Sequence, residues 1–106
     1  MKIISVDDET IKFDDGTTIE YYHDQDCCEH VYADFIQLQD TDIFQQSFTG
    51  VEIEGVKDSG FRLNGYFVPC YNVQNGWYSS DLVLVITAPA GKTRVDISDY
   101  VKDLIH

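Results

Sequence analysis

Hydrophobic and polar residues alternate in three short runs near the start of the chain. The runs span residues 2–6, 10–13 and 17–23 and are rich in β-branched and aromatic side chains. Two acidic pairs, Asp7-Asp8 and Asp14-Asp15, separate them, and Gly16 completes an Asp-Gly step that suits a tight hairpin turn. The pattern predicts a three-stranded antiparallel meander, with the acidic pairs in its turns as solvated caps of hydrogen bonds.

The hydrophobic period changes after this meander. Over residues 26–38, Cys28, Val31 and Phe35 fall at i, i+3 and i+7, which is the spacing of one face of a helix. Asp26 stands where an N-cap is needed, and an acidic residue three positions later completes an Asp version of the capping box. We therefore expect one amphipathic helix directly after the third strand.

The second half of the chain returns to β patterns. Strands are predicted within residues 50–58, 61–73, 77–88 and 92–97. Asn64-Gly65 lies at the centre of a predicted hairpin, and Asn75-Gly76 is a second turn of the same kind. Pro69 is expected at an edge or a bulge because it lacks the N–H that a central strand requires.

The chain closes with Ser98, which is placed to cap a short helix over residues 99–105. With this helix, the predicted fold class is α+β: a mostly antiparallel sheet, one main helix after the third strand and a short C-terminal helix. A length of 106 residues fits one domain spanning residues 1–106.

Charge then narrows the range of partners. The chain has 7 Lys+Arg against 19 Asp+Glu, a net charge of −12, so its field repels phosphates and anionic membranes. The basic residues are scattered along the sequence, which disfavours direct nucleic-acid binding. No apolar run approaches the roughly 20 residues that cross a bilayer, so we expect a soluble cytosolic protein. The acidity either serves solubility alone or draws the protein to a basic protein surface.

Candidate chemistry is concentrated just after the third predicted strand. His23 is expected at the strand end and Cys27 and Cys28 in the first turn of the helix, where their side chains can converge. Zinc binds thiolates and imidazoles in a tetrahedral arrangement, so these three residues are candidate ligands, with Cys70 or His30 as the fourth. A structural cluster at the helix start, without metal, is the alternative.

A catalytic thiol is a third interpretation of the same residues. Cys27 or Cys28 would act as the nucleophile and His23 or His30 as the base. The dense carboxylates nearby oppose this, because they raise the pKa of a thiol. No oxyanion loop, phosphate-binding loop or nucleophile motif is present in the sequence, so we do not expect an enzyme.

The segment "FDDGTTIEYYHDQDCCEHVYADF", residues 13–35, resembles the signature of a family of small uncharacterised phage and bacterial proteins. That signature is an Asp-Gly turn, a strand ending in His, and then Q-D-C-C-E before V-Y. Gln25 to Glu29 reproduce the Q-D-C-C-E motif, and His23 stands two residues before it, giving H-x-Q-D-C-C-E. Cys70 and His30 lie outside the signature.

The resemblance implies a phage origin and a function. Small acidic phage proteins include anti-CRISPR inhibitors, some of which block target-DNA loading by the type II RNA-guided nuclease. The resemblance therefore implies a non-enzymatic inhibitor in the host cytoplasm that contacts basic nuclease surface. From the residues themselves we expect it to carry structural zinc held by His23, Cys27, Cys28 and Cys70. The alternatives are a structural phage protein with unmetallated cysteines and a cysteine- or metal-dependent hydrolase.

Overall fold

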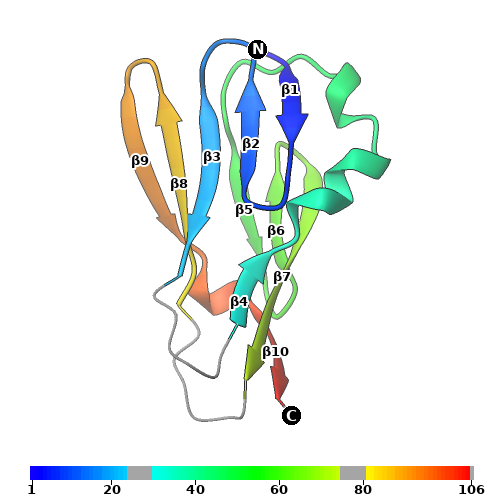
Figure 1. Cartoon of the computed structure of the whole chain (residues 1–106), viewed down its shortest axis with the longest axis vertical. Coiled ribbons are helices and arrows are strands. Elements are labelled where there is room, and N and C mark those ends of the chain that lie inside the picture. Colours follow the sequence, from blue (N-terminus) through cyan, green and yellow to red (C-terminus); the bar gives the residue numbers. More distant parts are fainter. Residues whose placement is uncertain (24–29, 75–80, 106) are drawn as a thin grey trace.

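The structure is a computed structural model that describes residues 1–23, 30–74 and 81–105. Its first sheet has the strand order β1-β2-β3-β8-β9, and every neighbouring pair in it is antiparallel (Figure 1). These strands are β1 (Ile3–Val6), β2 (Thr10–Phe13), β3 (Thr18–Tyr22), β8 (Val83–Ala88) and β9 (Gly91–Asp96). The first three confirm the predicted meander.

The second sheet is built around the long strand β7 (Tyr66–Gln74). Its order is β10-β7-β6-β5, and β4 also pairs with β7. The other strands are β4 (His30–Ala33), β5 (Ile53–Val56), β6 (Gly60–Leu63) and β10 (Lys102–Ile105). Strand β7 pairs with β6 up to Pro69 and with β4 and β10 beyond it, so the proline lies where β7 changes partners.

The predicted α+β class is wrong, because the described residues contain two mostly antiparallel sheets and only short 3₁₀ turns. These turns are η1 (Phe35–Asp40), η2 (Ile43–Gln45) and η3 (Ser98–Tyr100). In Figure 1, η1 and η2 lie beside β1. The described chain is therefore an all-β fold with 3₁₀ connections.

The predicted main helix fails over residues 30–38, and the rest of its first turn lies outside the described residues. Val31, Ala33 and Phe35 are buried, which is the period of two of a strand. Val31 and Phe35 also fit a helical stripe, so the local pattern fits both structures. The segment forms a strand because its backbone N–H and C=O groups pair with those of β7, which is distant in the sequence.

The predicted C-terminal helix is also wrong. Ser98 begins a single 3₁₀ turn instead of capping an α-helix. The chain then extends as β10 and pairs in parallel with the second half of β7, with Lys102 opposite Tyr71. A parallel partner about 30 residues earlier in the chain gives no local signal in the sequence.

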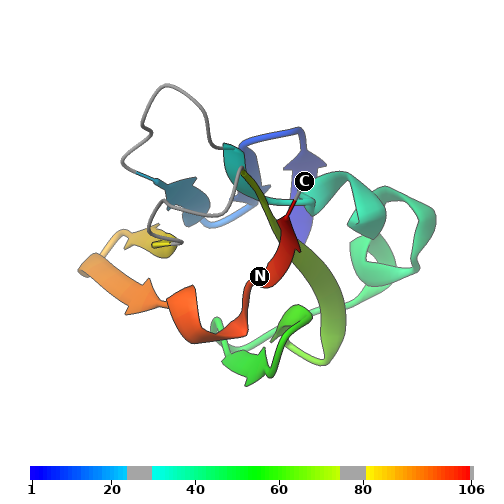
Figure 2. The same ribbon diagram turned by 90° about the horizontal axis from the view of Figure 1, so that it is seen from below.

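The hydrophobic core lies between the two sheets. Figure 2 shows the strands of both sheets arranged around a common interior. The fully buried side chains come from both sheets and from the 3₁₀ turns, and they include Ile11, Ile19, Leu84, Phe61, Leu63, Phe35 and Leu38. One apolar cluster therefore holds the two sheets and the 3₁₀ turns together.

The acidic turns behave as predicted. The Oδ1 atom of Asp7 accepts hydrogen bonds from the backbone N–H groups of Glu9 and Thr10, at 2.9 and 2.7 Å. Asp15 accepts from the backbone N–H of Thr17 at 2.9 Å. These hydrogen bonds favour the ionised carboxylates and lower the pKa of both Asp7 and Asp15.

The β6–β7 turn is fixed by Asn64 as well as by its glycine. Asn64 has a φ of 48° and Gly65 a φ of 90°, the left-handed pair that a tight hairpin requires. The side chain of Asn64 also accepts from Glu52 N–H at 2.6 Å and donates to the Gly50 carbonyl at 2.7 Å. It therefore ties the turn to the chain that leads into β5.

We expect Asn64→Ala to lower the free energy of unfolding by about 2 kcal/mol, because both hydrogen bonds and the favourable left-handed residue are lost. Asn64→Asp keeps the acceptor and the backbone preference and loses only the bond to the Gly50 carbonyl, so it should cost about half as much. Urea unfolding of the two variants measures the difference. Equal losses in the two variants would show that neither the hydrogen bond from Glu52 N–H nor the left-handed preference of the residue contributes to stability.

Candidate functional site

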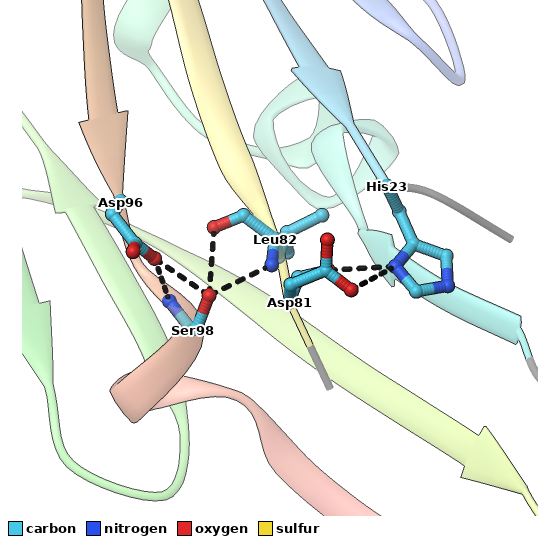
Figure 3. A network of polar contacts seen from close by, with 5 residues as sticks. All are labelled: His23, Asp81, Leu82, Asp96 and Ser98. Atoms are coloured by element: carbon cyan, nitrogen blue, oxygen red, sulfur yellow. Dashed lines mark hydrogen bonds and ion pairs between the residues drawn. The ribbon is translucent and has the colours of Figure 1, made fainter. Parts of the chain in front are cut away.

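His23 follows the last residue of β3, at the strand end where the sequence predicts it. Its side chain is 4% exposed, and its Nδ1 atom lies 2.6 Å from the Asp81 carbonyl oxygen and 3.3 Å from Asp81 Oδ1 (Figure 3). A carbonyl oxygen only accepts, so Nδ1 carries the proton and donates it. His23 therefore joins the end of β3 to the residues that lead into β8.

The chain just after Asp81 is anchored on its other side by Ser98. Leu82 N–H donates to the Ser98 hydroxyl at 3.0 Å, and that hydroxyl lies 2.6 Å from Asp96 Oδ1 (Figure 3). Ser98 N–H also donates to Asp96 at 2.9 Å, and these bonds lower the pKa of the Asp96 carboxyl. The start of β8 is thus fixed by β3 on one side and by the end of β9 on the other.

Only His23 and Cys70 of the four predicted zinc ligands belong to the described residues. Cys27 and Cys28 lie outside them, so the four-residue site stays a prediction. Cys70 is fully buried in the core and stands opposite Ala33 at the far end of β4 from His30. His30 and Ala33 are three positions apart on β4, which is about 10 Å along the strand. Among the described residues, no group of three or more His, Cys, Asp or Glu is placed to hold a metal ion.

The hydrogen bond of His23 suits a metal ligand. In metal sites, a ligating histidine usually donates its other ring N–H to a carbonyl or a carboxylate, and Asp81 offers both. Nε2 would then be the coordinating atom. Cys70 suits the role less well, because burial raises the pKa of its thiol to about 12 and so disfavours the thiolate that zinc binds.

Burial of the Cys70 thiol predicts a dependence of stability on pH. The folded-state pKa is about 12, against an ordinary value of 9.0, so the unfolded chain loses this proton first as the pH rises. The buried, protonated thiol therefore contributes its full share to the free energy of unfolding below about pH 9, and this share is lost as the pH rises toward 12.

We therefore expect the stability advantage of the wild type over Cys70→Ala to shrink by about 1.4 kcal/mol per pH unit above pH 9. Urea unfolding of both proteins between about pH 8 and about pH 10.5 measures this difference and cancels titrations that the two proteins share. A difference that stays constant over this range would contradict the burial of the thiol.

A concavity of about 270 Å³ with both acidic and aromatic lining residues lies on the surface, and we call it the acidic tyrosine pocket. It lies between the β1–β2 turn, the end of β3 and the segment from β4 into η1. Its lining residues are Asp8, Glu9, Tyr21, Tyr32, Ala33, Asp34 and Ile36. It therefore combines three carboxylates with two phenol rings.

The two tyrosine rings are held by packing. The Tyr21 ring meets the edge of the Phe35 ring at a centroid distance of 5.5 Å and an angle of 79°. The Tyr32 ring lies 5.4 Å from that of Tyr71. Because Phe35 belongs to the core, one wall of the pocket is fixed to the interior of the protein.

Among the described residues, three carboxylates and no basic side chain line the pocket, so its electrostatic potential is negative, and this contributes to the raised pKa values of its tyrosines. Burial raises the pKa of Tyr21, and the carboxylates of Glu9, Asp8 and Asp34 raise it further. Burial and the Asp34 carboxylate likewise raise the pKa of Tyr32. Negative charge beside a phenol disfavours its ionisation, so the same field favours a bound cation.

Sequence reasoning missed this pocket. It placed Asp8 in a solvated turn and put Tyr32 and Asp34 in a helix, where residues two apart point away from each other. In the extended chain, Tyr32 and Asp34 instead line the same pocket. The signal present in the sequence was the alternation of Val31 and Ala33, which would have placed Tyr32 on the opposite side of a strand.

Comparison with known proteins adds a family assignment. The model of a family described as a domain of unknown function, DUF7448, matches residues 1–84. The chain belongs to the DUF7448 family. The DUF7448 region contains His23, Cys70 and all residues of the acidic tyrosine pocket, while β9 and β10 lie beyond it. The family description states no activity, so the anti-CRISPR resemblance stays a prediction.

No curated protein and no solved structure matches the chain. Across the parts of this DUF7448 protein that the structure describes, no helix has the length and the hydropathy to cross a bilayer.

Proposed function

We propose that this DUF7448 protein is a binding protein without catalytic activity that holds a basic segment of a partner protein. The acidic tyrosine pocket carries the proposal. Three carboxylates and two tyrosine rings line one concavity, and both tyrosine pKa values are raised. An arginine or lysine side chain fits this chemistry, because its charge is attracted by the carboxylates and by the face of an aromatic ring.

Size and charge support a side chain as the occupant. A pocket of about 270 Å³ is small for a drug-sized ligand, for which sites of about 300–1,000 Å³ are usual. The net charge of −12 would speed the approach to a basic surface over a longer range. The pocket would then determine where the partner binds, and the net charge of the chain would raise the association rate.

The candidate partner is the type II RNA-guided nuclease that the sequence resemblance implies. Such nucleases hold the guide–target heteroduplex in a positively charged channel, and an acidic protein that occupies this surface would block target-DNA loading. The proposed role is therefore that of an anti-CRISPR inhibitor. An uncharacterised structural phage protein with the same binding pocket is the alternative.

A structural zinc site belongs to the same proposal. His23, Cys27 and Cys28 would supply three ligands, and the donor pattern of His23 supports its part. For the fourth ligand, the burial of Cys70 and the raised pKa of its thiol favour His30 over Cys70. Elemental mass analysis of untagged protein should find near-stoichiometric zinc that Cys27→Ser removes, and wild-type protein without metal would contradict the site.

Target cleavage by a purified type II nuclease tests the proposed role. Excess wild-type protein, added before the target DNA, should suppress cleavage. The variant Asp8→Asn/Glu9→Gln/Asp34→Asn should restore cleavage, because it keeps the shape of the pocket and removes its charge. Cleavage at the normal rate with excess wild type would exclude this nuclease as the partner.

A further inference from the structure

The outer face of the first sheet carries an ordered array of side chains on three neighbouring strands. The registers β3–β8 and β8–β9 place one residue of each strand in every row, so the array has three rows and three columns. The rows are Thr18–Thr87–Lys92, Glu20–Val85–Arg94 and Tyr22–Val83–Asp96. We call these residues the outer-face array.

This face is open to solvent and partly apolar. Tyr22 is 58% exposed, although it is a large aromatic residue, and Val83 and Val85 are half-buried. An open hollow of about 590 Å³ lies over the array, and Glu20, Arg94 and the two valines are among its lining residues. Exposed apolar side chains in a hollow with charged neighbours are typical of an interaction surface.

The charges of this face differ from those of the whole chain. Lys12 on β2 pairs with Thr18, which places it on the same face as Lys92 and Arg94. Asp81 also lines the hollow, so with the carboxylates of Glu20 and Asp96 the three positive charges meet three negative ones, and this face has no net charge. The whole chain carries −12. This is therefore a face that a second copy of the acidic chain can approach without strong repulsion.

We propose that the outer-face array joins two copies of this chain, face to face, about a two-fold axis parallel to β8. Such an axis exchanges the β3 and β9 columns and keeps the rows. Glu20 then lies over Arg94 of the second copy, and Tyr22 over Asp96 of the second copy. Val83 and Val85 of the central column meet their own equivalents. In the Glu20 and Tyr22 rows each contact pairs opposite charges, a hydroxyl donor with a carboxylate, or apolar groups, and in the third row the threonine hydroxyls face Lys92 and each other.

Two other arrangements fit the array less well. A two-fold axis perpendicular to the strands through Val85 would place Glu20 over Glu20 and Arg94 over Arg94, and like charges in contact oppose association. An anionic polymer such as single-stranded nucleic acid would meet Glu20 and Asp96 between the cations. The alternation of signs therefore favours the second copy with strand-parallel symmetry.

The array is small, so the dimer should be weak and depend on concentration. Sedimentation equilibrium of the wild type at rising concentration should give a mass that approaches twice 12.1 kDa. Arg94→Glu places two carboxylates in contact at two symmetric positions and should weaken the dimer at least about tenfold. Glu20→Arg should weaken it similarly, and Glu20→Arg/Arg94→Glu should restore it.

Lys57→Glu is the matched control, because Lys57 is exposed in the β5–β6 turn and its change alters the net charge as Arg94→Glu does. Circular dichroism checks that each variant folds. A wild type that stays monomeric at all concentrations would overturn the proposal, as would a dimer weakened equally by Arg94→Glu and Lys57→Glu. Binding of a single-stranded oligonucleotide to a monomer, lost in Arg94→Glu, would assign the face to a polyanion instead.

Discussion

Gly60→Ala should strongly destabilise the fold, because the added Cβ has no room between β6 and β7. An ideal Cβ at Gly60 lies 2.1 Å from the Val68 carbonyl oxygen and 2.9 Å from two further backbone atoms of β7. The neighbouring atoms are backbone, so they cannot move aside without separating the strands. Gly60 also has a φ of 150°, which other residues rarely adopt.

We expect this substitution to lower the free energy of unfolding by at least about 3 kcal/mol. That is a large share of the roughly 5–15 kcal/mol that stabilises a domain. Gly50→Ala is the matched control, since an added Cβ there meets no atom within 4 Å and should change stability by less than about 0.5 kcal/mol. Urea midpoints measure both. A Gly60→Ala variant as stable as the wild type would contradict the close pairing of β6 with β7.

Phe35→Ala is the second change with a large expected effect, and it affects both the core and the pocket. Phe35 is fully buried, and its ring contacts the Tyr21 ring that forms part of the acidic tyrosine pocket. Removing it leaves a cavity in the core, for which the usual loss of stability is about 3–5 kcal/mol. The loss of the edge-to-face contact should also free the Tyr21 ring and weaken cation binding.

Phe67→Ala provides the comparison, because the same side chain is removed from a site that is 43% exposed. It should lower the free energy of unfolding by about 1 kcal/mol or less and leave cation binding unchanged. Thermal or urea unfolding measures the first effect, and peptide titration below the unfolding transition measures the second. Similar losses in the two variants would contradict the central place of Phe35 in the core.

The strands that the sequence predicts correctly are those whose signals are local. β1, β2 and β3 alternate clearly and are joined by acidic turns, and the β6–β7 hairpin follows from Asn64-Gly65. β4 and β10 could not be predicted in this way, because both pair with β7 over a long separation in the chain. In each case a short segment with an ambiguous period forms the structure that its distant partner requires.

The same physical reason limits what the sequence says about the site. His23 could be placed at a strand end because its strand is local. The acidic tyrosine pocket instead joins Glu9 of the β1–β2 turn with Asp34 after β4, two segments from different sheets that line one concavity only in the folded chain. The seven basic residues, scattered in sequence, include three that gather on one sheet face through the strand registers. The pocket and the outer-face array therefore both depend on how the strands are ordered and paired in the folded chain.

We expect the acidic tyrosine pocket, and not the overall charge, to bind a basic partner. Calorimetric titration with a short arginine-rich peptide tests it most directly, with two triple variants that each raise the net charge by three, from −12 to −9. The pocket variant is Asp8→Asn/Glu9→Gln/Asp34→Asn. The control is Asp40→Asn/Glu52→Gln/Asp99→Asn, at exposed positions outside the pocket.

The pocket variant should bind the peptide at least about tenfold more weakly than the wild type, and the control variant should lose less than about threefold in affinity. Equal losses in the two triple variants would show that the overall charge alone attracts the peptide. That result would contradict the assignment of the pocket as the binding site.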